Sequence, residues 1–306
     1  MEKNLSQQEI RHARAHVNGV SLHYAECGNS THPLMLFVHG FPEAWFAWRT
    51  QMRHFSDRYH VVAVDTRGIN ESDKPGKVED YRIKPLVKDI VELIGKLGHD
   101  TCILVGHDWG GAIACSVALA APHRVQRLCL INAVHPVLFA RQLLHDPAQQ
   151  TASQYMLDFR GTDFPGVALR DDCSYLKAMF AGGGSTPDWL DEAALREYLA
   201  AWTRPGALAS GLCYYKATML YPGNDAQLAE VMNAEPDAFI LRMPTLVLWG
   251  MQDRYLLPGC LDGLDRFVPY LELHTYGDAS HWIVHEMPER INSMIETFAL
   301  GANAGD

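Results

Sequence analysis

The feature that most constrains the fold is an alternation of short apolar runs with helix-like segments. The runs are rich in β-branched and aliphatic residues, are bounded by Gly, Pro or Asp, and occupy residues 34–38, 61–64, 102–105, 127–131 and 245–249. Helix-like segments separate the earlier runs, at 45–55, 83–97 and 111–121. Strands that are apolar throughout are buried on both faces, and helical connections imply parallel pairing. The sequence therefore predicts an α/β fold with a mostly parallel sheet flanked by helices.

Two further segments complete the expected organisation. Residues 15–17 and 20–24 flank Asn18-Gly19, which predicts a β-hairpin before the first apolar run. Between about residues 134 and 236 the alternation stops, helix formers and aromatic residues dominate, and three glycines at 182–184 indicate a loop. We therefore expect one α/β core formed by residues 1–134 and 236–306, with a helical cap formed by residues 135–235 inserted into it.

Charge and cysteine content exclude several classes of protein. Lys and Arg number 26 and Asp and Glu 36, so the formal net charge is −10, whereas nucleic acids and anionic membranes are bound through basic surfaces. The seven cysteines have no CxxC spacing, and the first residues lack the apolar segment of a signal peptide. The longest apolar run, 112–121, is shorter than the roughly 18 residues that span a bilayer. We expect a cytoplasmic protein without nucleic-acid or membrane partners; the sequence leaves a homodimer open.

One predicted strand ends in a turn suited to a nucleophile. The strand at 102–105 leads into Gly106-His107-Asp108-Trp109-Gly110-Gly111 and then into an Ala-rich helix. This is the pattern G-x-nucleophile-x-G, in which the central residue has a strained backbone and glycines avoid clashes with the neighbouring strand and helix. The helix N-terminus adds N–H groups and a positive dipole end. Asp108 is therefore a candidate nucleophile; the alternative is an Asp that only caps the helix.

Two other segments supply candidate partners for Asp108. The strand at 34–38 ends in His39-Gly40-Phe41-Pro42-Glu43, where this type of fold places the second N–H group of an oxyanion hole. The strand at 245–249 is followed by Asp253, and a later Gly-rich turn is followed by His281. Asp108, Asp253 and His281 thus occur in the order nucleophile, acid and base, which is the chain order of α/β-hydrolases.

With these motifs the sequence resembles the α/β-hydrolases that use an aspartate nucleophile, which are the epoxide hydrolases and the related haloalkane and haloacid dehalogenases. The resemblance covers nearly the whole chain and rests on HGFPE at 39–43, DTRGINESDKP at 65–75, GHDWGG at 106–111, WGMQD at 249–253 and SHW at 280–282. One departure is Ile69-Asn70, where the family usually has an aromatic residue and a glycine. The resemblance implies an α/β-hydrolase fold with an inserted helical cap and an enzyme that needs no cofactor or metal.

An aspartate nucleophile is suited to displacement at a saturated carbon, because the anhydride it would form with an ester collapses back easily. Asp108 would form an alkyl ester, and water deprotonated by His281 would then hydrolyse it. Asp253 would fix the imidazole tautomer, while the backbone N–H groups of Phe41 and Trp109 would stabilise the oxyanion. His281 would act in the second step only.

The leaving group decides between the activities. An epoxide oxygen needs a proton or a strong donor, typically two tyrosine hydroxyls, whereas a halide needs N–H donors. The segments SQYMLDF at 153–159 and LCYYKA at 212–217 resemble the two cap motifs of epoxide hydrolases, with Cys213 in place of the usual Asn. This resemblance implies that Tyr155 and Tyr215 hydrogen-bond the epoxide oxygen, with Tyr214 as the alternative to Tyr215. An apolar or aromatic epoxide is expected, because the expected substrate contacts are mostly aromatic: His39, Phe41, Pro42, Trp109 and Trp282.

A dehalogenase and a non-catalytic small-molecule-binding protein of the same fold are the alternatives. Phe41 stands where many haloalkane dehalogenases have an Asn that helps to hold halide. Trp109 and Ala112 stand where fluoroacetate-type dehalogenases have arginines. A binding protein would not need the complete set of candidate catalytic residues. We therefore predict an epoxide hydrolase; its substrate and its regio- and enantioselectivity do not follow from the sequence.

Overall fold

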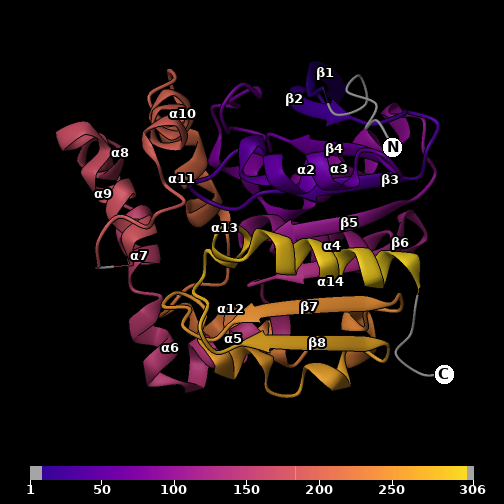
Figure 1. Ribbon diagram of the computed structural model, residues 1–306. Helices are drawn as coiled ribbons and strands as arrows, with labels where there is room; N and C mark the ends of the chain where they lie inside the picture. The colour runs from indigo at the N-terminus through magenta and orange to yellow at the C-terminus, as the bar shows by residue number, and fades with distance from the viewer. Residues whose placement is uncertain (1–8, 183, 302–306) are drawn as a thin grey trace.

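The computed structural model describes residues 9–182 and 184–301, and its centre is one eight-stranded sheet (Figure 1). The strand order is β1-β2-β4-β3-β5-β6-β7-β8; β1 pairs with β2 and β2 with β4 antiparallel, and the other neighbours are parallel. The predicted α/β fold with a mostly parallel sheet is thus confirmed. The strands are β1 Arg11–Val17, β2 Val20–Cys27, β3 Leu34–Val38, β4 His60–Val64, β5 Cys102–His107, β6 Val125–Ile131, β7 Thr245–Gly250 and β8 Leu271–Tyr276.

The strands follow the apolar patterns of the sequence with one exception. Strands β3, β4, β5 and β7 are buried at every position, as their continuous apolar composition predicts. The hairpin of β1 and β2 turns at Asn18-Gly19, where both φ angles are positive, as a tight hairpin turn requires. The edge strand β8 was not among the predicted strands, because its residues LELHTY lack the continuous apolar run that marks the internal strands; most of its side chains are partly or fully exposed.

Helices cover both faces of the sheet (Figure 1). Leu34 and Leu36 of β3 belong to a core shared with α3 Ile83–Lys96 and α4 Trp109–Ala120. Met35 and Phe37 point to the other face, in a core shared with α2 Arg49–Phe55 and α14 Pro288–Leu300. Alternate residues of one strand therefore pack into opposite cores.

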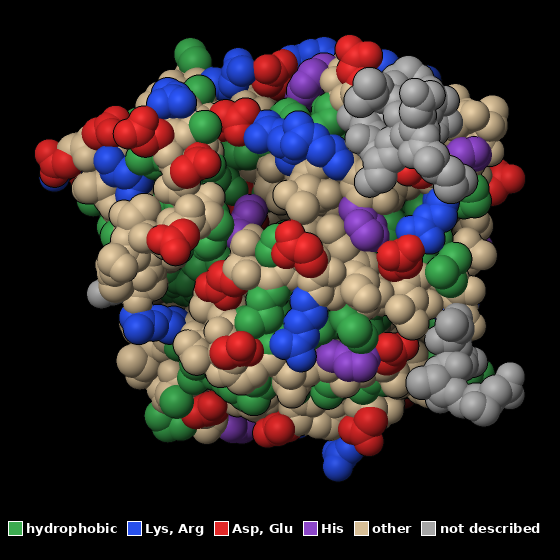
Figure 2. Space-filling model, viewed as in Figure 1, with side chains coloured by type: hydrophobic (Ala, Val, Ile, Leu, Met, Phe, Trp, Pro, Cys, Tyr) green, Lys and Arg blue, Asp and Glu red, His purple; other side chains and the backbone are tan. Residues whose placement is uncertain are grey.

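Acidic and basic side chains are interspersed over the face shown in Figure 2.

Between β6 and β7 the elements of the described residues are helices. They are α5 Pro136–His145, α6 Pro147–Ala152, α7 Tyr155–Phe159, α8 Phe164–Ala168, α9 Arg170–Ala181, α10 Glu192–Trp202, α11 Ala207–Ala217 and α12 Asp225–Met232. Figure 1 shows α6 to α11 beyond the end of the sheet toward which β7 and β8 run, whereas α5 and α12 pack against each other. The division at residues 135 and 235 stays a prediction. Within the described ranges, no helix combines the length and the apolar character that crossing a bilayer requires.

Candidate active site

The turn after β5 holds Asp108 in a backbone conformation that few side chains adopt. Its φ is 53° and its ψ is −122°, the strained geometry typical of a nucleophile elbow. Space requires the neighbouring glycines. A Cβ atom at Gly106 would lie 2.4 Å from the carbonyl oxygen of Gly110, and one at Gly110 would lie 2.0 Å from that of Val38. The close approach of three backbone segments therefore presents Asp108 at the start of α4.

The two carboxylate oxygens of Asp108 have different neighbours. The backbone N–H of Phe41 donates to Oδ1 over 2.8 Å. Atom Nε2 of His281 lies 3.6 Å from Oδ2. The loop that carries Phe41 can come this close because residue 40 is a glycine. A Cβ atom at this position would lie only 2.4 Å from the Cβ of Asp108. Trp109, the second predicted N–H donor, is the first residue of α4, where backbone N–H groups have no partner within the helix.

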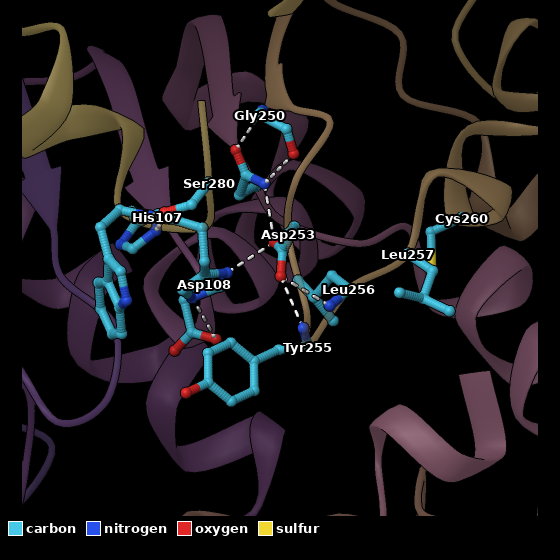
Figure 3. A network of polar contacts seen from close by, with 12 residues as sticks. His107, Asp108, Gly250, Asp253, Tyr255, Leu256, Leu257, Cys260 and Ser280 are labelled. Carbon is cyan, nitrogen blue, oxygen red and sulfur yellow. Dashed lines mark hydrogen bonds and ion pairs between the residues drawn. The ribbon is translucent and has the colours of Figure 1, made fainter. Parts of the chain in front are cut away.

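His281 and Asp253 come together from the loops after β8 and β7. The Nδ1–H of His281 donates to Oδ2 of Asp253 over 2.7 Å, and both side chains are buried. The other oxygen, Oδ1, accepts the backbone N–H groups of Tyr255 at 2.8 Å and Leu256 at 2.9 Å (Figure 3). Asp253 therefore fixes one imidazole tautomer, with Nε2 directed at Asp108. The structure brings together all three residues of the predicted triad.

The charge state of His281 depends on the two carboxylates. Burial alone would lower its pKa, but the nearby Asp253, to which it is hydrogen-bonded, and then Asp108 outweigh burial and raise the pKa of His281 to about 9. At neutral pH the imidazole of the resting protein is therefore protonated and pairs with both carboxylates.

Asn132 is a positioning residue that the sequence analysis missed. It is fully buried at the end of β6, with a φ of 37°. Its Nδ2 donates to Asp253 Oδ2 over 2.7 Å and to the carbonyl of Gly250 over 3.2 Å, and its Oδ1 accepts the N–H of Gly250 over 2.8 Å. The sequence did carry a signal for Asn132. This residue directly follows a predicted strand, at the edge of the sheet where the loops of the other candidate residues also begin.

Tyr155 at the start of α7 and Tyr215 on α11 lie next to each other. Their ring centroids are 5.9 Å apart and the rings are nearly perpendicular, at 76°. Burial, followed by the charge of Asp108, raises the pKa of Tyr155 well above its usual value. Burial, Tyr155 and Asp108 do the same for Tyr215. Both phenols therefore stay protonated and can act as donors close to Asp108.

The neighbouring Tyr214 points elsewhere. Its hydroxyl donates to the backbone carbonyl of Arg67 in the core over 2.7 Å. Both rings contact Trp109, with centroid distances of 5.3 Å for Tyr215 and 5.6 Å for Tyr214, but Tyr215 also packs edge-on against Phe41 at 5.4 Å. This geometry favours Tyr215 over Tyr214 as the partner of Tyr155, because the Tyr215 ring lies against Tyr155 while the Tyr214 hydroxyl is bonded in the core.

Three of the predicted substrate contacts are used to hold loops. The Nδ1–H of His39 donates to the carbonyl of Gly40 over 2.8 Å, and its Nε2 accepts the N–H of Thr66 over 3.2 Å. The carbonyl of Pro42 accepts a 2.6 Å bond from the indole of Trp202 in the cap. The indole of Trp282 donates to the carbonyl of Met179. A substrate contact of His39, Pro42 or Trp282 stays a prediction, whereas Phe41 and Trp109 adjoin Tyr215.

Glu43 is a second residue whose role the sequence analysis missed, although it lies in the HGFPE motif. Its Oε1 accepts bonds from Nε2–H of His285 at 2.6 Å and from the hydroxyl of Tyr198 at 2.9 Å. Burial would raise its pKa, but His285 and His107 outweigh burial and hold the pKa of Glu43 well below its usual value. The Nε2–H of His107 donates to the carbonyl of His281 over 2.8 Å. Since Oε2 of Glu43 lies 3.1 Å from Nδ1 of His107, this buried carboxylate connects α10 with the loop of His281.

The fold and the site define an α/β-hydrolase. Residues 33–288 match the model of the family described as the alpha/beta hydrolase fold, so the chain belongs to that family. Within the described residues, no three His, Cys, Asp or Glu side chains are grouped so as to hold a metal ion.

Within this family the chain is similar to epoxide hydrolases. Human Epoxide hydrolase 4 is 34% identical over 288 residues, which cover 92% of this chain and 76% of that protein. The AB hydrolase superfamily protein YfhM of Bacillus subtilis (strain 168) is 35% identical, over 91% of this chain and 94% of that protein. The crystal structure of Bacillus megaterium epoxide hydrolase in complex with an inhibitor matches with a TM-score of 0.88 and 36% identity, over 94% of this chain and 99% of that chain. The chain is thus an epoxide-hydrolase-like α/β-hydrolase.

Proposed function

We propose that the protein is an epoxide hydrolase that converts a small-molecule epoxide and water into a vicinal diol. One observation carries the proposal: Tyr155 and Tyr215 lie against each other, and the Tyr215 ring packs on Phe41 and Trp109, the two residues that adjoin the carboxylate of Asp108. The charge of Asp108 helps to raise the pKa of both phenols. A carboxylate supplies a nucleophile for a saturated carbon, and two protonated phenols supply donors for the oxygen that leaves. The similarity to epoxide hydrolases supports the same assignment.

In the first half of the reaction Asp108 attacks one carbon of the epoxide. The N–H of Phe41 binds Oδ1, so Oδ2 is the oxygen that forms the new C–O bond. The ring C–O bond breaks, and the oxygen is protonated by Tyr155 or Tyr215. The product of this half is an alkyl ester of Asp108 that carries a neighbouring hydroxyl group.

In the second half water hydrolyses the ester. Formation of the ester removes the negative charge of Asp108, which is one of the causes that raise the pKa of His281. The imidazole then passes its Nε2 proton by way of solvent to the tyrosinate that the first half left, and the free Nε2 can accept a proton from the attacking water. The oxyanion develops on Oδ1, where the N–H of Phe41 already lies. Collapse of the tetrahedral intermediate breaks the ester C–O bond, and the leaving alkoxide takes the proton of the new carboxyl group. The diol is released, and the carboxylate of Asp108 and the protonated His281 are restored.

The surroundings of the tyrosine pair favour an apolar or aromatic epoxide. The ring of Tyr215 packs edge-on against Phe41, Trp109 and Phe159, with centroid distances of 5.4, 5.3 and 4.8 Å. Tyr155 contacts the same Phe159 ring at 5.2 Å. Aromatic walls with two hydroxyls and one carboxylate are the composition of a site for an apolar ligand that has one polar reacting group.

Epichlorohydrin tests the proposal, because it carries both an epoxide and a C–Cl bond. We expect the purified protein to release 3-chloro-1,2-propanediol with no early chloride. Prompt chloride release with the epoxide retained would identify a dehalogenase, and stoichiometric binding without product release would identify a binding protein. The variant Asp108→Asn should form neither product.

A matched pair of variants tests the tyrosine assignment. Tyr155→Phe combined with Tyr215→Phe should lower epoxide opening by at least about 100-fold, because general-acid assistance contributes about 10²- to 10⁴-fold. Tyr214→Phe removes the neighbouring hydroxyl, which bonds to a core carbonyl, and should change the opening rate far less. Equal losses in both would contradict the assignment.

A further inference from the structure

We propose that Tyr255 is a positioning residue for His281, which it ties to the cap through the carbonyl of Met179 at the end of α9. The inference rests on the proposed function, because it concerns the hydrolysis of the alkyl ester. Its basis is an arrangement in which two aromatic residues contact the imidazole and both donate to one cap carbonyl.

The imidazole of His281 contacts two aromatic rings that also lie against each other, with centroids 6.4 Å apart. The Tyr255 ring is 5.2 Å from it at an angle of 74°, and the Trp282 ring is 4.8 Å from it at 89°. The hydroxyl of Tyr255 donates to the carbonyl of Met179 over 3.0 Å, and the indole N–H of Trp282 donates to the same oxygen over 3.2 Å. A single oxygen of α9 therefore anchors two of the rings that contact His281; a third, that of His107, lies 4.7 Å away.

Two hydrogen bonds also fix the backbone of Tyr255. Its N–H donates to Oδ1 of Asp253 over 2.8 Å (Figure 3). Its carbonyl accepts a 2.7 Å bond from the side chain of Gln149 on α6. One residue thus contacts Asp253 through its backbone, His281 through its ring and the cap through its hydroxyl.

The ring of Tyr255 also contacts Tyr155, one of the two candidate proton donors. It packs edge-on against Tyr155, with a centroid distance of 5.3 Å and an angle of 78°. Burial, followed by the charge of Asp253, raises the pKa of Tyr255, so the hydroxyl is a donor at neutral pH. Since this donor is used on Met179, Tyr255 acts on the reaction through His281 and not as a third proton donor.

The consequence is specific to one chemical step. His281 acts only after the ester has formed, whereas the position of Asp108 depends on the glycine turn and on the N–H of Phe41. Loss of the Tyr255 hydroxyl frees the ring from the cap and lets the imidazole tilt away from the ester carbonyl. Small misplacements of a catalytic group cost up to about 100-fold in rate. Hydrolysis of the ester should therefore slow while its formation does not.

The test uses Tyr255→Phe in the full-length protein with epichlorohydrin as the probe. Rapid quenching followed by intact mass spectrometry measures the fraction of alkylated enzyme, and diol analysis measures turnover. We expect the rate constant of ester hydrolysis to fall at least about tenfold, that of alkylation to stay within about twofold, and the alkyl-enzyme to accumulate. The pH profile of the hydrolysis step should shift, because the tilted imidazole is farther from Asp253.

Tyr81→Phe is the matched control, because the buried Tyr81 also donates its hydroxyl to a backbone carbonyl, that of Pro75, at 2.9 Å. It should leave both rate constants unchanged. An unchanged hydrolysis rate in Tyr255→Phe, or an equal fall of alkylation and hydrolysis, would overturn the positioning role alone. A wild-type protein that forms neither diol nor alkyl-enzyme would overturn the proposed function as well.

Discussion

Replacement of Asn132 by glycine should destabilise the protein and slow ester hydrolysis, because the Asn132 side chain holds Asp253 and the end of β7. Glycine suits the test, since it adopts the φ of 37° found at this position without strain. The change therefore removes three hydrogen bonds, one to Asp253 and two to Gly250, and little else.

The expected loss of stability follows from these bonds. A buried hydrogen bond contributes about 1 kcal/mol net, so three bonds contribute about 3 kcal/mol. The added freedom of a glycine in the unfolded chain costs a further 0.5–1 kcal/mol, roughly. The free energy of unfolding should thus fall by about 3–4 kcal/mol. Asp253 keeps its bonds from His281, Tyr255 and Leu256, so the fold should survive.

Urea unfolding followed by tryptophan fluorescence measures the change, with Asn292→Ala as the control. Asn292 is also buried, but its Oδ1 has no hydrogen-bond partner in the part of the chain that the structure describes. Its replacement should cost less than about 1 kcal/mol, because no comparable set of bonds is lost. Equal losses at Asn132 and Asn292 would refute the reasoning.

The same variant carries a kinetic expectation. Without the Nδ2 donor of Asn132, Oδ2 of Asp253 keeps His281 as its partner but loses the bond that fixes its orientation toward the Nδ1–H. Hydrolysis of the alkyl-enzyme should slow by about 10- to 100-fold, measured by quenched-flow mass spectrometry. A destabilised variant with a normal hydrolysis rate would show that Asn132 supports the fold and not the base.

Two further predictions concern stability. Asn70→Gly should lower the free energy of unfolding by about 1–2 kcal/mol in urea, because Asn70 donates to the buried Asp65 over 2.8 Å and accepts from Arg204 of the cap over 2.9 Å; a gain in stability, from relief of its positive φ, would contradict this. The raised pKa of His281, about 9 against 6.5, should stabilise the fold on the order of 3 kcal/mol below pH 6.5, and this contribution is lost as pH rises through 9. The stability difference between wild type and His281→Gln should therefore shrink from pH 6 to pH 10, and a difference independent of pH would rule the shift out.

The sequence predicted the fold well where local pattern and burial agree. Strands that are apolar at every position had to be internal strands of a covered sheet, and the Asn18-Gly19 turn required a hairpin. Strand β8 lies at the edge of the sheet, where it has one neighbouring strand and is only partly buried. Its sequence therefore does not need the continuous apolar run of the internal strands. The helices of the insertion followed from composition, but their packing did not.

The candidate site divides in the same way. The chain order of Asp108, Asp253 and His281 could be read because the two aspartates follow predicted strands and His281 follows a Gly-rich turn. The carboxyl ends of parallel strands meet at one edge of the sheet, which brings such residues together. Tyr255 could not be assigned, because its role depends on the carbonyl of Met179, 76 residues away. No local sequence pattern indicates which side chain will donate a hydrogen bond to a backbone oxygen of a distant helix.

Different residues hold the groups that are proposed to form the ester and those that are proposed to hydrolyse it. In the proposed mechanism, ester formation depends on the glycine turn, which positions Asp108, and on Tyr155 and Tyr215 of the predicted cap. Ester hydrolysis depends there on His281, which contacts Asp253 and the two rings bound to Met179. The cap takes part in both, through α7 and α11 in the first and through α9 in the second. A change that opens the cap as a whole should therefore slow both steps, whereas loss of the α9 contact alone should leave alkylation intact and trap the ester. The ratio of the two rate constants thus reports which part of the cap has moved.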